Sequence, residues 1–298
     1  MRILLTGASG FVGPHVMARL PCVPLEWGGA PVDIRDGDRV RRAVAECGAA
    51  AVIHLAAVSA IPASFQDPRA TFEANLFGTL NLLQALDAAS FRGVLLYVGS
   101  GQVYGDVPGE RLPVTEDELP RPVNPYAVSK LAAERLCHQW SRASPYSIVM
   151  ARPFNHIGPG QDRKFAVADF AAQIAEIRLG RRPAAVQVGD LSVVRDLTDV
   201  ADVADAYALL LERGRNGEVY NVCSGTGTSL QAVLDRMLAL AGVSARIETQ
   251  GDRLRSGEPA RIVGSHRKLH AATGWSPRRP LEHSLNAILD YWIRTLDA

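Results

Sequence analysis

Several features are scarce or missing in this chain, and each scarcity excludes a class of protein. Only four cysteines occur among 298 residues, with no Cys-x-x-Cys pair, so neither a disulfide framework nor a zinc site of that kind is indicated. No apolar run approaches the roughly 18 residues of a membrane-spanning helix, and none resembles a signal peptide. The 32 basic and 31 acidic residues nearly cancel, so no net charge favours nucleic acid or a membrane. We therefore expect a cytoplasmic protein with neither partner.

Histidines that could bind a metal are dispersed along the chain. His54, His156, His266 and His270 show neither the His-x-x-x-His nor the His-Glu-x-x-His spacing of zinc sites. We therefore expect no metal.

Short apolar runs recur between longer segments with helical character. Apolar runs that polar residues do not interrupt are typical of strands buried on both faces of a parallel sheet. Strands are expected at residues 3–5, 23–25, 52–56, 94–98 and 147–150, and helices at 13–20, 38–47, 68–89 and 125–142. This alternation predicts an α/β fold with a doubly wound, Rossmann-like parallel sheet.

The alternation fades after about residue 152, where loops rich in Gly, Pro and Arg separate helices expected at 200–213 and 230–242. We expect residues 1–155 to form a dinucleotide-binding domain, to which later segments can return. Residues 156–298 would form mainly a smaller substrate-binding lobe. Residues 246–279 contain eight Arg or Lys against three Asp or Glu, which indicates either an anionic ligand or a solvated basic face.

Three glycines follow the first expected strand and open a helix. At this place Gly7 permits a tight turn, Gly10 lets the backbone approach a pyrophosphate, and Gly13 lets the helix pack closely on the strand. Their Gly-x-x-Gly-x-x-Gly spacing in this setting predicts a dinucleotide site. Glu26, near the end of the second strand, is either a surface residue or the acid that holds the adenosine ribose. In the second case its charge would favour NAD over NADP.

The run from Asn124 to Lys130 carries the clearest catalytic pattern. Asn124 suits a helix N-cap and Pro125 the first helical position, so Tyr126 and Lys130 would stand one turn apart on one face. A nearby ammonium would lower the pKa of the phenol and suit Tyr126 to general acid catalysis. Ser100 lies at the carboxyl end of an expected strand, where its hydroxyl either belongs to a turn or orients a reacting carbonyl with Tyr126.

Together these motifs resemble the extended short-chain dehydrogenase/reductases that modify nucleotide sugars. Runs at 124–134, 151–161, 219–225 and 264–275 are more narrowly similar to the GDP-6-deoxy-D-lyxo-4-hexulose reductases, which make GDP-D-rhamnose. The resemblance covers almost the whole chain. The motifs that carry it are Gly7/Gly10/Gly13, His54-Leu55-Ala56-Ala57, Asn75 with Gly78-Thr79, Ser100 with Val103-Tyr104-Gly105, Tyr126-x-x-x-Lys130 and Arg152-Pro153-Phe154-Asn155.

The resemblance also implies roles for individual residues. Ser100 and Tyr126 would meet the sugar carbonyl, and Gln102 would stand where related dehydratases carry a glutamate. Asn155, Arg195 and Arg255 would face the diphosphate, with Glu258 toward the nucleotide ribose; a salt bridge to a neighbouring acid is the alternative for Arg195. The cofactor would contact Gly7, Gly10, Phe11, Val12, Gly13, Asp33, Ile34, Leu55, Ala57 and Lys130, with Asp33 and Ile34 at the adenine.

The implied activity is reduction, by NADH or NADPH, of the C4 ketone of a GDP-linked 4-keto-6-deoxyhexose to GDP-D-rhamnose. Three alternatives stay open: a reductase that forms GDP-6-deoxy-D-talose, a 4,6-dehydratase or 4-epimerase that keeps its NAD bound, and a dinucleotide-sensing regulatory protein. The last has no need of Ser100, Tyr126 and Lys130 together. The resemblance also implies a homodimer through the helices near 70–89 and 125–142.

Overall fold

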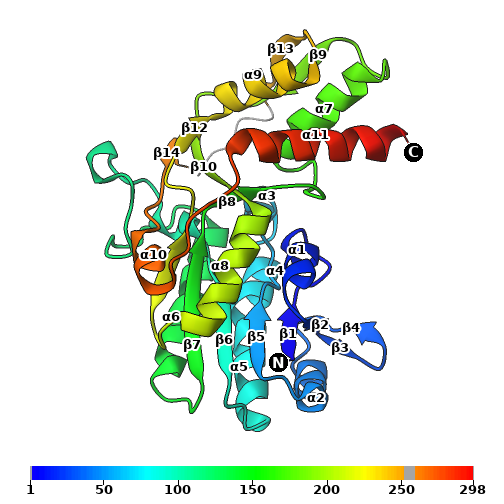
Figure 1. Cartoon of the computed structure of the whole chain (residues 1–298). Coiled ribbons are helices and arrows are strands. Elements are labelled where there is room, and N and C mark those ends of the chain that lie inside the picture. Colours follow the sequence, from blue (N-terminus) through cyan, green and yellow to red (C-terminus); the bar gives the residue numbers. More distant parts are fainter. Residues whose placement is uncertain (1, 252–258, 298) are drawn as a thin grey trace.

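A parallel sheet of six strands forms the centre of the larger part of the molecule (Figure 1). The structure, a computed structural model, describes residues 2–251 and 259–297. Strand order is β2-β1-β5-β6-β7-β11, and every neighbouring pair is parallel. The strands are β1 (Ile3–Thr6), β2 (Cys22–Pro24), β5 (Ala51–His54), β6 (Val94–Val98), β7 (Ser147–Pro153) and β11 (Val219–Val222). This arrangement confirms the predicted doubly wound fold.

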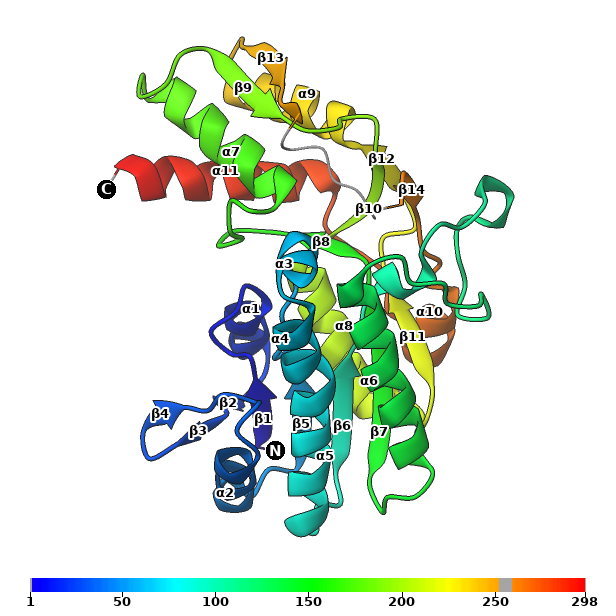
Figure 2. The ribbon, with the colours of Figure 1, turned by 180° about the vertical axis from the view of Figure 1, so that it is seen from behind.

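Helices cover both faces of the sheet because alternate strand residues point to opposite sides. Leu4 and Leu95 pack with α2, α5 and α6, which lie in front of the sheet in Figure 2, whereas Leu5 and Leu96 pack with α1, α8 and α10. The helices are α1 (Val12–Arg19), α2 (Gly37–Cys47), α5 (Gly78–Ala88), α6 (Pro125–Ser141), α8 (Val200–Arg213) and α10 (Arg267–Thr273). Burial of both faces explains why the strands are continuous apolar runs.

A smaller lobe lies above the carboxyl ends of the strands in Figure 1. Its core joins α7 (Ala166–Arg178), α9 (Leu230–Ala241) and α11 (Leu281–Asp297) to a parallel strand pair, β9 (Ala185–Val188) and β13 (Arg246–Thr249). The sequence had not indicated α7 or α11. Every residue from Val167 to Ala175 is buried, including the polar Asp169 and Gln173, so α7 has no solvent-exposed polar face along this stretch.

Short segments connect the two parts. Between them β10 (Val194–Asp199) pairs with β8 (Asn155–Ile157), β12 (Gly227–Ser229) and β14 (Arg261–Ile262). The remaining elements are β3 (Glu26–Trp27), β4 (Ala30–Pro31), α3 (Ile61–Gln66), α4 (Pro68–Phe72), the π-helix η1 (Glu73–Phe77), and the 3-10 turns η2 (Gly101–Tyr104) and η3 (Gly109–Arg111). Within the ranges that the structure describes, no helix is both long and apolar enough to cross a membrane.

The single helix expected at 68–89 is three consecutive pieces, α4, η1 and α5. The π-turn contains the buried Asn75, whose Oδ1 accepts a hydrogen bond from the Val58 amide at 2.8 Å. Its Nδ2 donates to the Val58 carbonyl at 3.1 Å and to the Ser129 hydroxyl at 2.9 Å. Asn75 therefore ties this helix to the loop after β5 and to α6, a long-range role that local helix propensity cannot reveal.

Candidate active site

The glycine-rich loop lies where β1 and β5 end side by side. After β1 the chain continues to β2 on one side of β1 and later to β5 on the other side. Doubly wound sheets bind ligands in the crevice where the strand order reverses in this way. Gly7 has φ +70°, and a Cβ on it would lie 2.6 Å from the Ala56 amide nitrogen. A Cβ on Gly13 would lie 2.0 Å from the Ala8 carbonyl oxygen. Both positions need glycine, and the bare backbone fits the close approach of a dinucleotide pyrophosphate.

Buried hydrogen bonds hold the ends of β1 and β5 together below this loop. Thr6 Oγ1 accepts from the Ala56 amide at 3.1 Å and donates to His54 Nδ1 at 2.7 Å. His54 Nε2 donates to Thr79 Oγ1 at 3.0 Å, and Thr79 donates to the Asn75 carbonyl. Burial lowers the pKa of His54 to about 3, with a smaller effect from Lys130, so the ring stays neutral. His54 is thus a structural residue, and its partners fix its tautomer.

A cavity of about 460 Å³, hereafter the first cavity, extends from the glycine loop to α6. It brings together most residues that the sequence had associated with cofactor and chemistry. Among its lining residues are Gly7, Gly10, Phe11, Val12, Leu55, Ala57, Ser100, Gln102, Tyr126, Lys130 and Asn155.

Other residues expected at the cofactor lie outside the lining of the first cavity. Gly13 is behind the loop, in α1. Asp33 precedes α2, where its carboxylate pairs with Arg35 at 2.6 Å and the arginine lowers its pKa. Ile34 is buried, and Glu26 is exposed in β3.

The start of α6 positions Tyr126 and Lys130 as the sequence predicts. Asn124 is the N-cap, with Oδ1 accepting from the Ala127 amide at 2.8 Å, and Pro125 is the first helical residue. Tyr126 is half-buried, while only 4% of Lys130 is exposed. The Lys130 ammonium donates to the Val98 carbonyl at 2.6 Å, and burial lowers its pKa to about 8.

The pKa of Tyr126 differs from the expectation. Burial raises it above the ordinary value, and a hydrogen bond with Ser100 offsets this only in part. The expected lowering by Lys130 is not found, because the ammonium is directed to the Val98 carbonyl at the end of β6. The phenol therefore keeps its proton near neutral pH.

Two further groups complete this side of the first cavity. Ser100, 6% exposed, caps η2 and accepts from the Gln102 amide at 3.2 Å. The Gln102 Oε1 is buried, and no residue that the structure describes forms a hydrogen bond with it. Such an oxygen is costly to leave unpaired, so a donor from a bound molecule is a natural partner.

A buried ion pair anchors α6 to the sheet. Arg152, in β7, donates to both carboxylate oxygens of Glu134 at 2.7 and 2.8 Å, and to the Tyr104 hydroxyl at 2.8 Å. Tyr104 donates in turn to Asn221 Oδ1, in β11, at 2.7 Å. Arg152, which belongs to a motif of the resemblance, thus fixes the helix that carries Tyr126 rather than lining the first cavity.

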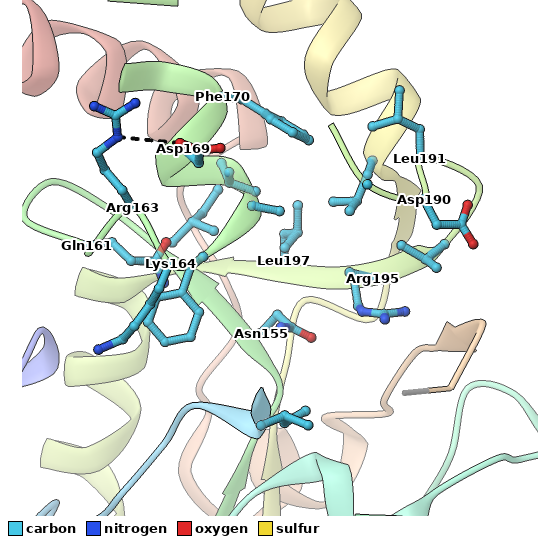
Figure 3. Close-up of a pocket in the computed structure, with 18 of the residues that line it drawn as sticks. Asn155, Gln161, Arg163, Lys164, Asp169, Phe170, Asp190, Leu191, Arg195 and Leu197 are labelled. Carbon is cyan, nitrogen blue, oxygen red and sulfur yellow. Dashed lines mark hydrogen bonds and ion pairs between the residues drawn. The ribbon is translucent and has the colours of Figure 1, made fainter. Parts of the chain in front are cut away.

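A second cavity, of about 730 Å³, adjoins the first and rises toward the smaller lobe (Figure 3). Asn155 lines both cavities, and Arg195 lines the second. Arg195 is 6% exposed, and its Nη1 donates to the carbonyls of Pro259 at 2.8 Å and Val194 at 3.1 Å. Arg255 and Glu258, the other residues expected at the nucleotide, lie outside the described residues.

Several residues that no sequence motif had assigned to the site lie where the two cavities meet. His156, Gln161 and Lys164 line both, and the buried Tyr207, from α8, lines the first. The run 151–161 carried part of the resemblance, but no spacing assigned its residues a task. For His156 and Gln161, only their position in the similar run could have drawn attention to them, whereas Lys164 and Tyr207 lie outside that run.

Comparison with known proteins agrees with this geometry. A family model described as the NAD dependent epimerase/dehydratase family matches residues 3–223. GDP-6-deoxy-D-mannose reductase of Pseudomonas aeruginosa is 45% identical over 295 residues, which cover 98% of this chain and 97% of that protein.

Solved structures give the same result. RMD from Pseudomonas aeruginosa complexed with NADPH superposes with a TM-score of 0.91 at 43% identity, covering 99% of both chains. UDP-glucose 4-epimerase of Thermus thermophilus in complex with NAD gives 0.85 at 33% identity, covering 98% of this chain and 99% of that one. The resemblance found in the motifs is therefore confirmed. This chain belongs to the NAD dependent epimerase/dehydratase family.

Proposed function

We propose that this protein is an NADH- or NADPH-dependent oxidoreductase that reduces the C4 ketone of a GDP-4-keto-6-deoxy-D-mannose-type sugar, giving GDP-D-rhamnose. The observation that carries the proposal is the first cavity, in which Ser100 and Tyr126 face the same space as the glycine loop. The similarity to a GDP-6-deoxy-D-mannose reductase over 98% of the chain supports the substrate class.

The roles of the catalytic residues follow from their chemistry. When bound, a reduced nicotinamide supplies the hydride. Tyr126 would donate the proton that the sugar oxygen needs, since its raised pKa keeps the phenol protonated. Ser100 would orient that oxygen, and Lys130 would hold the nicotinamide ribose. Gly7, Gly10, Phe11, Val12, Leu55 and Ala57 would contact the dinucleotide. The resemblance also implies contacts from Gly13, Asp33 and Ile34, the last two at the adenine.

The two adjoining cavities suit a substrate with two ends. The hexose would occupy the first, while the diphosphate and nucleoside extend past Asn155 toward Arg195 in the second. Arg255 and Glu258 remain expected nucleotide contacts. On this assignment residues 1–155 chiefly bind the cofactor and residues 156–298 mainly the substrate.

Gln102 distinguishes reduction from dehydration. Loss of water from a sugar needs an acid and a base, and an amide exchanges no proton near neutral pH. The similarity to UDP-glucose 4-epimerase makes a dehydratase or epimerase the alternative activity. For this chain we expect no conversion of GDP-mannose to its 4-keto-6-deoxy form. Gln102→Ala should slow ketosugar reduction about tenfold. The variant removes the buried oxygen that would accept a hydrogen bond from a sugar hydroxyl. Steady-state rates check this, and an unchanged rate would show that Gln102 only packs in its turn.

The proposed activity is tested by mixing purified protein with the ketosugar and either NADH or NADPH. Absorbance of the reduced nicotinamide should fall in proportion to product, and NMR of the product should show the rhamno configuration. A talo product would correct only the stereochemistry. Cofactor that binds but is never oxidised would instead favour a regulatory protein.

We also propose a cytoplasmic homodimer. All four cysteines are free, as a reducing compartment requires. Phe77, in η1, is 53% exposed and Val128, in α6, is 40% exposed, and both elements belong to the helices expected to pair. Phe77→Asp should convert the dimer to a monomer, as measured by light scattering coupled to gel filtration. Phe65→Asp, on α3 outside the pairing helices, is the matched control and should leave the dimer intact. A monomeric wild-type protein would contradict the proposal.

A further inference from the structure

The loop from residue 158 to 165, which joins β8 to α7, lies against the start of α1. His15 Nε2, in α1, donates to the Pro159 carbonyl at 3.0 Å. The rings of Phe11 and His156 stack with centroids 5.9 Å apart and planes inclined by 5°. A segment that leads into the smaller lobe is therefore fixed beside the glycine loop.

Lys164, near the end of this loop, lines both cavities. In Figure 3 its side chain lies on the opposite side of the second cavity from Arg195, and its amino group points away from that guanidinium. It shares the lining of the first cavity with Gly10, Phe11 and Val12 of the glycine loop. The two cations are thus separated. Arg195 lines the second cavity, proposed for the sugar nucleotide, and Lys164 lies toward the first cavity, proposed for the cofactor.

Charge around the first cavity indicates what Lys164 binds. The glycine loop contains no Lys or Arg and offers backbone amides, whereas a dinucleotide pyrophosphate carries two negative charges. Among the described residues that line the first cavity, the Lys and Arg side chains are those of Lys130 and Lys164. Lys130 is buried beside Tyr126, with its ammonium on the Val98 carbonyl. Lys164 is therefore the cation that this lining offers to the cofactor phosphates.

We infer that Lys164 binds the pyrophosphate of the dinucleotide cofactor from the side opposite the glycine loop. The inference rests on the cofactor site of the proposed function. Its ammonium also lies 3.7 Å from Asp162, but both side chains are more than half exposed. An exposed pair of this kind is weak, so the pyrophosphate, with its two negative charges, can replace it. The substrate-side loop and the cofactor site are then linked through one lysine.

The test is titration of wild type, Lys164→Gln and Lys164→Arg with NADH and NADPH, without sugar, followed by nicotinamide fluorescence. We expect the glutamine variant to bind both dinucleotides about fivefold more weakly, as for loss of a partly exposed charge-assisted contact, and arginine to restore most of the affinity. Added salt should weaken binding by wild type more than by Lys164→Gln. Lys268→Gln is the matched control, since Lys268 pairs with Glu218 away from both cavities.

Separate outcomes identify which claim fails. Unchanged dinucleotide affinity in Lys164→Gln, with weaker binding of GDP, would overturn the inference and place Lys164 at the substrate diphosphate. Equal weakening of NADH and GDP binding would also overturn it, because the effect would then be structural. Failure of the wild-type protein to bind either dinucleotide would overturn the proposed function itself.

Discussion

The Tyr126→Phe variant is expected to reduce the ketosugar about 10²–10⁴-fold more slowly than wild type. The substitution removes the hydroxyl that would give its proton to the sugar oxygen, while the ring still fills its half-buried place at the start of α6. Dinucleotide affinity should change little, because the glycine loop and Lys130 are untouched. Single-turnover rates with saturating cofactor, beside fluorescence titrations of NADH, separate the two effects.

Tyr291→Phe provides the control for this experiment. Tyr291 lies in α11 and lines neither cavity, so the same loss of a hydroxyl should leave the rate unchanged. A Tyr126→Phe rate within a factor of about two of wild type would remove Tyr126 from the mechanism, because general acid catalysis is worth far more than that.

Replacing Arg152 with methionine is expected to lower the free energy of unfolding by about 3–5 kcal/mol. The side chains of Arg152 and Glu134 are 3% and 2% exposed, so the variant would leave a buried carboxylate without its cation. The two bonds to Glu134 and the one to Tyr104 would be lost together. Urea unfolding of wild type and variant measures the difference.

Arg111→Met is the matched control for Arg152→Met. Arg111 pairs with Glu118 at 2.7 Å, but 41% of its side chain is exposed, so its removal should cost less than about 1 kcal/mol. Similar losses of unfolding free energy in the two variants would show that the buried Arg152–Glu134 pair stabilises the fold no more than an exposed pair does. Retained activity in Arg152→Met with reduced stability would agree with a purely anchoring role.

Much of the fold could be predicted because burial imposes a simple pattern on the sequence. Strands covered on both faces are continuous apolar runs, and β6 and α8 occupy the predicted ranges, 94–98 and 200–213. Features that depend on distant partners could not be predicted. The π-turn at Asn75 is accompanied by hydrogen bonds to Val58 and Ser129, and the polar Asp169 and Gln173 of α7 are buried because other elements surround that helix.

The candidate site also combines local features that the sequence could predict with long-range features that it could not. The cap at Asn124 and the four-residue step from Tyr126 to Lys130 are local, so the sequence could place both side chains on one face of α6. The direction of the Lys130 ammonium depends on the Val98 carbonyl, 32 residues earlier, and on burial. The sequence therefore predicted the pair but not the raised pKa of Tyr126.

The most direct test of the proposed reduction is transfer of deuterium to the ketosugar from NADH or NADPH that carries deuterium at both positions on C4 of the nicotinamide ring. Wild-type protein should give a 6-deoxyhexose product with one deuterium at C4 and an equal amount of oxidised cofactor, as hydride delivery to the C4 ketone requires. Product without the label, or steady formation of 4-keto-6-deoxy sugar from GDP-mannose without net oxidation of cofactor, would contradict the proposed reductase.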